Sequence, residues 1–493
     1  MGARDMTHSA AIRSKLDHPI IDADGHTLEF QPAFLEYLKE VGGPDIVQRF
    51  DKRVVDRLDQ TPSLIGSQWY TATPQERKEK RLRRMPWWGV QTKNTLDRAT
   101  ATLPRLLYER LDDFGIDLTI LYPTIGTQHL HLVDDELRRA CCRAHNNYQA
   151  TVNKEFADRI VPVAVIPMNT PEEALAELEY AVGTLGMKAV LMPSYVLRLR
   201  ADGQGSWYDT FCLDSLYDYD PVWQRCIELK VCPSFHSNNQ GFGSRTSISN
   251  YCYNHIGHFA AAGEAIAKAA FLGGVTRRFP DLRMIFLEGG VGLGLVLYTS
   301  LIGHWKKRNL KALENYNPAN LNKELFFELH NKYGGKMVEG KLDTEEGRRR
   351  ALWAGNPSFG SVPVPGDPGA IDDFAACGIN KASDIKDLFV PNFYFGCEAD
   401  DPITAWAFDA KKNPYGAKIN TLLGSDIGHW DVPDMTEVGE EAYEMVEHGL
   451  ITADDFKDFV FANPVRLFTH LNKNFFKGTV VESHVNALSG AKG

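Results

Sequence analysis

The chain lacks the features that mark disulfide scaffolds and membrane-spanning proteins. Its eight cysteines are spread over 493 residues and form no C-x-x-C pair, which argues against a disulfide framework and against structural-zinc spacing. The longest apolar run, residues 291–303, is interrupted by glycines and falls short of the roughly 18 residues that a membrane span needs. We therefore expect reduced thiols and no contact with a membrane.

The chain also has fewer basic than acidic residues. The 54 lysines and arginines are outnumbered by 64 aspartates and glutamates, so the formal net charge is −10. Because an acidic surface repels phosphate backbones, nucleic-acid binding is not expected. The N-terminal residues show neither the apolar core of a secretory signal nor a myristoylation motif, since Met6 stands where that motif carries Ser or Thr. These features predict a cytoplasmic protein.

What the chain does have is a regular alternation of short β-rich runs with amphipathic helical patterns, which is typical of a sheet built from βα units. Eight such runs predict an α/β protein with the (β/α)8 TIM barrel fold. A doubly wound open sheet is the competing architecture, but its Gly-rich phosphate turn is missing after the first run. The runs are HPIIDAD (18–24), DLTILYPT (117–124), RIVPVAVIP (159–167), KAVLMPS (188–194), KVCPSFHS (230–237), LRMIFLEGG (282–290), NFYFGCE (392–398) and INTLLGSD (419–426).

Three long intervals do not follow the βα rhythm. Residues 30–93, 195–221 and 306–386 are rich in Pro, Gly, aromatic and charged residues. We interpret them as insertions that form a cap over the C-terminal face of one barrel spanning residues 18–474. Residues 1–17 are then an N-terminal arm and residues 475–493 a C-terminal tail.

The hexapeptide Ile-Asp-Ala-Asp-Gly-His, residues 21–26, ends the first predicted strand. Side chains two positions apart on a strand point to the same side, so Asp24 and His26 can converge above the barrel. A carboxylate oxygen and an imidazole nitrogen aimed together make half of a divalent-metal site. A strand-end Asp followed by a turn His explains this segment equally well when it is taken alone.

Metal-type side chains also end other predicted strands. His236, Glu288 and Asp426 close the fifth, sixth and eighth runs. Each has an ordinary structural explanation: a satisfied histidine, a salt-bridged glutamate or a helix-capping aspartate. Their coincidence at the carboxyl ends of barrel strands, where barrel enzymes build their sites, favours one shared site.

Five segments together resemble the amidohydrolase superfamily. They are IDADGH, FHS, FPDLRMIFLEGG, GSDIGHWD and FANPVRLF, in this order between residues 20 and 468. Within that superfamily the chain is similar to the branch that contains aminocarboxymuconate-semialdehyde decarboxylase and γ-resorcylate decarboxylase. The resemblance implies a barrel that binds one divalent ion.

The resemblance also implies roles for individual residues. Asp24, His26, His236 and Asp426 fall on the metal-ligand positions of the branch, and this mixed nitrogen and oxygen set suits Zn²⁺ or Mn²⁺. Asp426 lies where relatives move a proton. The decarboxylases carry His-Gly-Gly where this chain has Glu288-Gly289-Gly290. Glu288 could act as a base, bind the metal or hold a neighbour in place, so we place Asp426, Glu288 and His236 in the catalytic group.

Substrate-binding candidates come from the loops that follow the strands. Loops at this end of a barrel could aim cations and hydroxyls at a planar acid, and an aromatic Gly-rich segment, residues 241–259, could cover it. Solvated loops and ordinary packing are the structural alternatives. The candidates are Tyr195, Arg198, Arg245, His255, His258 and His429.

Three functions remain open on the sequence. The first is a metal-dependent decarboxylase of a small aromatic or unsaturated carboxylic acid. The second is a metal-dependent hydrolase of an amide, ester, lactone or carbon–carbon bond, which the glutamate at position 288 favours. The third, a non-catalytic barrel that binds a small molecule or a partner chain, ranks below both because the ligand set is complete. We also expect a homodimer.

Overall fold

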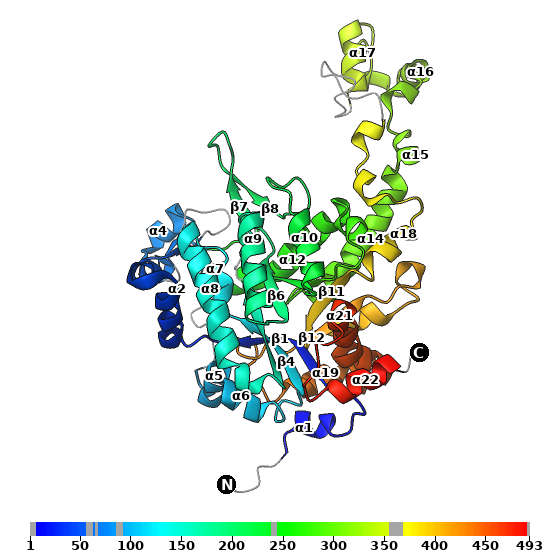
Figure 1. Ribbon diagram of the computed structural model, residues 1–493. Coiled ribbons are helices and arrows are strands. Elements are labelled where there is room, and N and C mark those ends of the chain that lie inside the picture. The colour runs from blue at the N-terminus through cyan, green and yellow to red at the C-terminus, as the bar shows by residue number, and fades with distance from the viewer. Residues whose placement is uncertain are drawn as a thin grey trace. The chain divides into compact units, whose positions relative to one another are not determined.

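The computed structural model describes residues 6–55, 63–64, 68–84, 92–237, 244–353 and 368–490. Within these ranges eight parallel strands follow one another in chain order as β1, β4, β5, β6, β9, β10, β11 and β12 (Figure 1). All eight predicted runs contain a strand. Their bounds are Ile21–Thr27, Leu118–Pro123, Ile160–Val165, Ala189–Pro193, Pro233–His236, Met284–Phe286, Phe393–Glu398 and Asn420–Gly424.

Backbone hydrogen bonds join the first strand to the segment that follows the last one. The amide of His26 donates to the carbonyl of Ile427 at 3.0 Å, and the amide of Asp426 donates to the carbonyl of Asp24 at 3.1 Å. The sheet therefore curls back onto its own first strand. The predicted (β/α)8 barrel is confirmed, and the open doubly wound sheet is wrong.

Helices follow most of the strands, and their ends carry the expected capping residues. The side chain of Asp134 caps α8 (Asp135–Val152), and Thr170 caps α9 (Pro171–Leu178), which begins with proline. Further helices include α10 (Asp220–Glu228), α12 (His258–Leu272), α14 (Gly290–Arg308), α18 (Asp384–Phe389), α19 (Val438–Glu447), α21 (Asn463–Leu471) and α22 (Glu482–Gly490). None of the helices in the described ranges is both long and apolar enough to span a bilayer.

The first two predicted insertions have structure of their own. Within 30–93, α2 (Gln31–Asp51) buries Phe34 and Leu38 against α8. The indole of Trp69 donates to the carbonyl of Ile248, so this insertion contacts the segment that follows β9. Within 195–221, β7 (Val196–Leu199) and β8 (Ser206–Asp209) form an antiparallel hairpin. The assignment of these intervals to a cap stays a prediction.

Residues 299–385 form a second compact unit, separate from the unit of residues 1–298 and 386–493. It contains α15 (Leu310–Leu313), α16 (Lys323–Tyr333) and α17 (Glu345–Leu352). Neither α16 nor α17 buries a residue. The division of the chain into an arm, one barrel with insertions and a tail stays a prediction.

The carboxylate of Asp22, fully buried on β1, fastens the two ends of the barrel sheet together. It accepts hydrogen bonds from Thr119 Oγ1 on β4 at 2.7 Å, from Ser425 Oγ at 2.8 Å and from the Ser425 amide at 2.9 Å. The amide of Asp24 donates to it at 3.1 Å. One side chain thus links β1 to its neighbour on each side and holds the residue before Asp426.

A bulge in β1 makes room for this arrangement. The register against β4 shifts between Asp22 and Gly25. A Cβ at position 25 would lie 2.4 Å from both Asp22 Oδ2 and Thr119 Oγ1, so only glycine fits there.

Replacing Asp22 tests its role in closing the sheet. We expect Asp22→Ala to lower the free energy of unfolding by about 3 kcal/mol or more, because several buried donors lose their acceptor. Asp22→Asn keeps one acceptor oxygen, so its free energy of unfolding should fall by less. Urea denaturation of metal-free protein measures both. A loss below about 1 kcal/mol for the alanine variant would contradict this role.

The same residue predicts a pH dependence of stability. Burial raises the pKa of Asp22 to about 6, against the opposing hydrogen bonds from Thr119 and Ser425. The folded protein then binds this proton more tightly than the unfolded chain, so the stabilisation is present at low pH and is lost as the pH rises from about 4 to about 6. The stability of the wild type relative to Asp22→Asn should fall across this window. A constant difference would show that Asp22 is already ionised at pH 4.

Candidate metal centre

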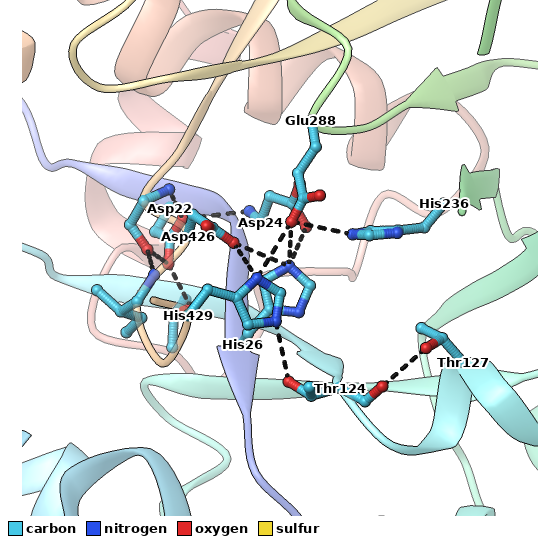
Figure 2. Close-up of polar contacts among 12 residues, drawn as sticks. Asp22, Asp24, His26, Thr124, Thr127, His236, Glu288, Asp426 and His429 are labelled. Atoms are coloured by element: carbon cyan, nitrogen blue, oxygen red, sulfur yellow. Dashed lines mark hydrogen bonds and ion pairs between the residues drawn. The ribbon is translucent and has the colours of Figure 1, made fainter. Parts of the chain in front are cut away.

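Six side chains converge where the strands of the barrel end (Figure 2). They come from β1, from the end of β9, and from the turns after β10 and β12. Their ligand atoms form two overlapping groups, in each of which all the atoms lie within 4.8 Å of one another. One group is Asp24, His26, His236 and Glu288, and the other is His26, Glu288, Asp426 and His429.

Glu288 Oε1 lies at the middle of the cluster. It is 3.3 Å from His26 Nε2, 3.2 Å from His236 Nε2 and 3.3 Å from His429 Nδ1. His26 Nε2 is also 3.4 Å from Asp24 Oδ1 and 3.5 Å from Asp426 Oδ1. Apart from His429, none of these side chains is more than 5% exposed. The structure thus brings together the four residues that the sequence predicts as ligands, with Glu288 and His429 added.

The donor atoms of this cluster fit a divalent cation. Among the buried atoms of the described ranges that have no hydrogen-bond partner, five belong to this cluster and lie around His26 and Glu288: Asp24 Oδ1, His26 Nε2, His236 Nε2, Glu288 Oε1 and Asp426 Oδ1. Leaving one such polar atom unsatisfied costs free energy, and five gathered in one cluster are a costly arrangement unless a cation is bound. Two imidazole nitrogens with carboxylate oxygens form a set that suits Zn²⁺ or Mn²⁺.

The ring of His236 is held in the form that a metal ligand needs. Its Nδ1–H donates to the carbonyl of Ser237 at 3.0 Å, so Nε2 carries the lone pair and faces the cluster. The Ser237 hydroxyl lies 2.6 Å from His258 Nε2 and 3.3 Å from the Tyr195 hydroxyl. Two of the predicted substrate-binding residues, Tyr195 and His258, therefore contact the residue that follows His236, and a substrate contact for either stays a proposal.

Both ring nitrogens of His429 have a polar partner. Nδ1 lies 2.6 Å from Asp426 Oδ1, and Nε2 lies 3.1 Å from Thr124 Oγ1. The ring also stacks on His26, with 3.9 Å between the ring centroids. The Nδ1 contact is an ion pair and the Nε2 contact is a hydrogen bond, so both ring nitrogens are engaged. His429 is thereby positioned as a group that could pass a proton at the edge of the cluster.

The carboxylates of Asp24, Glu288 and Asp426 lie close together in the cluster and shift the pKa values of their neighbours. Burial lowers the pKa of His26, but the neighbouring Asp24 and Glu288 outweigh it and raise this pKa to about 10. Burial and the charge of Glu288 raise the pKa of Asp426 well above its usual range. On the next strand, burial and the charge of Glu288 raise the pKa of Glu398 to about 8. A bound cation would reverse this balance and favour neutral imidazoles and ionised carboxylates.

Backbone strain coincides with the cluster. Glu288 has φ 52° and Asp426 has φ 49°, so both lie in the left-handed region that residues other than glycine rarely adopt. Such conformations cost free energy and persist where the surrounding structure enforces them. The turns after β10 and β12 are thus constrained so that two carboxylates face the same point.

Comparison with known proteins agrees with this architecture. Residues 106–311 match the family model described as amidohydrolase. The matched stretch holds His236 and Glu288, while Asp24, His26 and Asp426 lie outside it. The predicted resemblance to the amidohydrolase superfamily is confirmed.

Solved structures with the same fold are distant in sequence. The IDCase of Metarhizium anisopliae is 13% identical, with a TM-score of 0.52, and the match covers 94% of this chain and 99% of that one. A 5-carboxyvanillate decarboxylase of Novosphingobium aromaticivorans is 12% identical, with a TM-score of 0.50 and coverage of 92% and 98%. A 2,6-dihydroxybenzoate decarboxylase from Rhizobium is 17% identical, with a TM-score of 0.48 and coverage of 92% and 99%. At these identities the likeness to the first two structures concerns the barrel fold alone.

Arg198 is engaged in contacts with the protein itself. Its Nε donates to Asp209 at 3.0 Å, Nη1 to the carbonyl of Asn169 at 2.6 Å and Nη2 to the Tyr219 hydroxyl at 2.9 Å. All three nitrogens of the guanidinium are used to hold the β7–β8 hairpin against the barrel. A substrate contact for Arg198 stays a proposal.

The two remaining substrate-binding candidates lie on the segment after β9. His255 contacts Phe259, with ring centroids 5.4 Å apart, and Phe259 in turn contacts His236 at 5.3 Å. Arg245 is exposed. His255 is thus one ring removed from the cluster, and a substrate contact for either residue stays a proposal.

Sequence reasoning missed Asp22 and Thr124. Asp22 precedes Asp24 and His26 at the same spacing of two, and this alternation was the available signal. Nothing in the sequence near Thr124 points to its contact with His429, because the two residues are 305 positions apart.

The metal content of purified variants distinguishes the residues that bind the ion from the other residues of the cluster. We expect Asp24→Ala and His236→Ala to lose the ion, because each removes a donor atom, whereas Glu288→Gln should retain it and lose turnover. Elemental analysis of protein purified without added metal gives the stoichiometry. Glu398→Gln, a carboxylate on the neighbouring strand outside both groups, is the matched control and should keep its metal. An empty site in Glu288→Gln would make Glu288 a ligand.

Proposed function

We propose that this chain is a mononuclear metal-dependent decarboxylase of a small aromatic or unsaturated carboxylic acid. The observation that carries the proposal is the cluster itself. Five of its buried ligand atoms have no hydrogen-bond partner and lie around His26 and Glu288, and the His429–Asp426 pair lies at its edge. This arrangement combines a place for a cation with a group that can move a proton.

Asp24, His26, His236 and Asp426 would hold the ion, either Zn²⁺ or Mn²⁺. The 5-carboxyvanillate decarboxylase of similar fold was solved with bound manganese. When bound, the ion would polarise a carboxylate or phenolate of the substrate and stabilise the charge that develops there.

The residues of the chain would supply the proton. In decarboxylation the bond between the ring carbon and the carboxylate breaks, CO₂ leaves, and the ring carbon takes one proton. Asp426 is the proposed donor, and His429, 2.6 Å away and partly exposed, would pass it a replacement proton taken from solvent. Thr124 fixes the orientation of that imidazole from the other side. Glu288 would assist by holding His26, His236 and His429 in position.

Hydrolysis is the second candidate, and the position of Glu288 favours it. Its carboxylate takes the place of the histidine found in the decarboxylases, and its Oε1 lies within 3.3 Å of three imidazole nitrogens. A carboxylate there could accept the proton of an attacking water, while Asp426 protonates the leaving group. The products would be an acid and its partner, with no CO₂. The homodimer and the cytoplasmic location remain predictions from the sequence.

Product analysis distinguishes the two reactions. Over a panel of hydroxybenzoates, lactones and amides, the metal-loaded enzyme should release CO₂ from at least one hydroxybenzoate. Measuring CO₂ together with titratable acid covers both outcomes. Acid without CO₂ would establish the hydrolase and overturn the decarboxylase.

A substitution of His429 tests the proton path. We expect His429→Asn to keep the metal and to lower kcat by about 10²–10⁴-fold, the usual contribution of a positioned acid or base. His448→Asn is the matched control, since it removes an exposed imidazole that does not belong to the cluster, and it should change kcat far less. Equal losses in the two variants would remove His429 from the mechanism.

A further inference from the structure

We propose that a basic cavity at the opposite end of the barrel binds a small organic polyanion. The cavity has a volume of about 760 Å³, within the range of small-molecule sites. It lies where β10, β11 and β12 begin, because Arg283 precedes β10, Tyr394 is in β11 and Asn420 opens β12. These strands are parallel, so the cavity lies across the barrel from Asp426, about 20 Å away at roughly 3.3 Å per residue.

The charge of the lining is opposite to that of the whole chain. The chain carries a net charge of −10. The cavity nevertheless has one carboxylate, Asp387, among its lining residues, against four permanent cations and a histidine. The basic residues are Arg283, Lys386, Arg466, Lys473 and His470. Cations gathered in a concave site attract anions more strongly than the same charges on a flat surface do.

Three of these cations are not neutralised by the protein. Arg466 pairs with Asp458 at 2.7 Å. Across the described ranges, by contrast, Arg283, Lys386 and Lys473 have no carboxylate oxygen within the 4.0 Å of an ion pair. Lys386 Nζ donates to the carbonyl of Tyr415 at 3.0 Å, and Arg283 Nη1 donates to that of Pro280 at 2.7 Å. Carbonyl oxygens leave both positive charges uncompensated.

Arg283 gives the strongest reason for an anionic ligand. It is half-buried, and burial lowers the pKa of its guanidinium, outweighing the opposing effect of neighbouring groups that include Tyr394 and Asp281. The planar guanidinium of arginine can donate two parallel N–H hydrogen bonds to a carboxylate or a phosphate. An anion in the cavity would relieve the cost of burying that charge.

The rest of the lining indicates an organic body. Val390, Pro391 and Leu488 supply apolar surface, and the buried side chains of Val465 and Tyr394 also line the cavity. An inorganic ion would leave this surface uncovered. The ligand class is therefore a small molecule with two or more phosphate or carboxylate groups on a carbon skeleton, and its site is separate from the candidate metal centre.

Calorimetric titration of the metal-loaded protein at low salt tests the proposal with two probes, citrate and fructose 1,6-bisphosphate. At least one should bind saturably, and Arg283→Gln should weaken it by about tenfold or more. Lys386→Gln is the second variant should Arg283→Gln misfold. Lys418→Gln, whose ammonium already pairs with Asp455, is the matched control and should bind as the wild type does. The probe that binds identifies carboxylate or phosphate recognition.

Asp24→Ala distinguishes this cavity from the metal centre. It should bind the probe with unchanged affinity, whether or not the proposed decarboxylase activity exists. Saturable binding by neither probe, binding lost with Asp24→Ala, or binding unchanged in both Arg283→Gln and Lys386→Gln would each overturn the proposal.

Discussion

The site depends on one buried carboxylate that joins the two ends of the barrel. Asp22 binds Thr119 of β4 on one side and Ser425, directly before Asp426, on the other. It also accepts from the amide of Asp24. Asp24 lies two residues after Asp22, and Asp426 directly follows Ser425, which binds Asp22. Asp22 therefore positions the candidate ligands at both ends of the sheet. Closure of the barrel and assembly of the cluster have the same physical cause.

The cluster that results is preorganised. Left-handed backbone at Glu288 and Asp426 aims two carboxylates inward, and the Ser237 carbonyl selects the tautomer of His236. A cation bound there would compensate the negative charge and the unsatisfied donor atoms that the fold has collected. Backbone strain and the burial of unpaired polar atoms destabilise the metal-free protein, and binding of a cation would offset this cost.

Much of this could be predicted because the informative contacts follow from local rules. Strand runs are visible as buried β-rich segments, and in a barrel their carboxyl ends meet at one face, so Asp24, His26, His236 and Asp426 could be grouped before any geometry was known. Contacts that depend on distant packing could not. The bulge that requires Gly25, the Thr124–His429 contact and the engagement of Arg198 by Asp209 all arise from how loops settle on the finished barrel. The basic cavity is of the same kind, since its cations come from segments spread over residues 283–473.

The most direct measurement is anomalous diffraction from crystals of protein purified without added metal, with data collected at the zinc and manganese edges. The account predicts one peak, about 2.0–2.3 Å from atoms of Asp24, His26, His236 and Asp426. A map with no peak at that point, or with the ion bound by other residues, would contradict it.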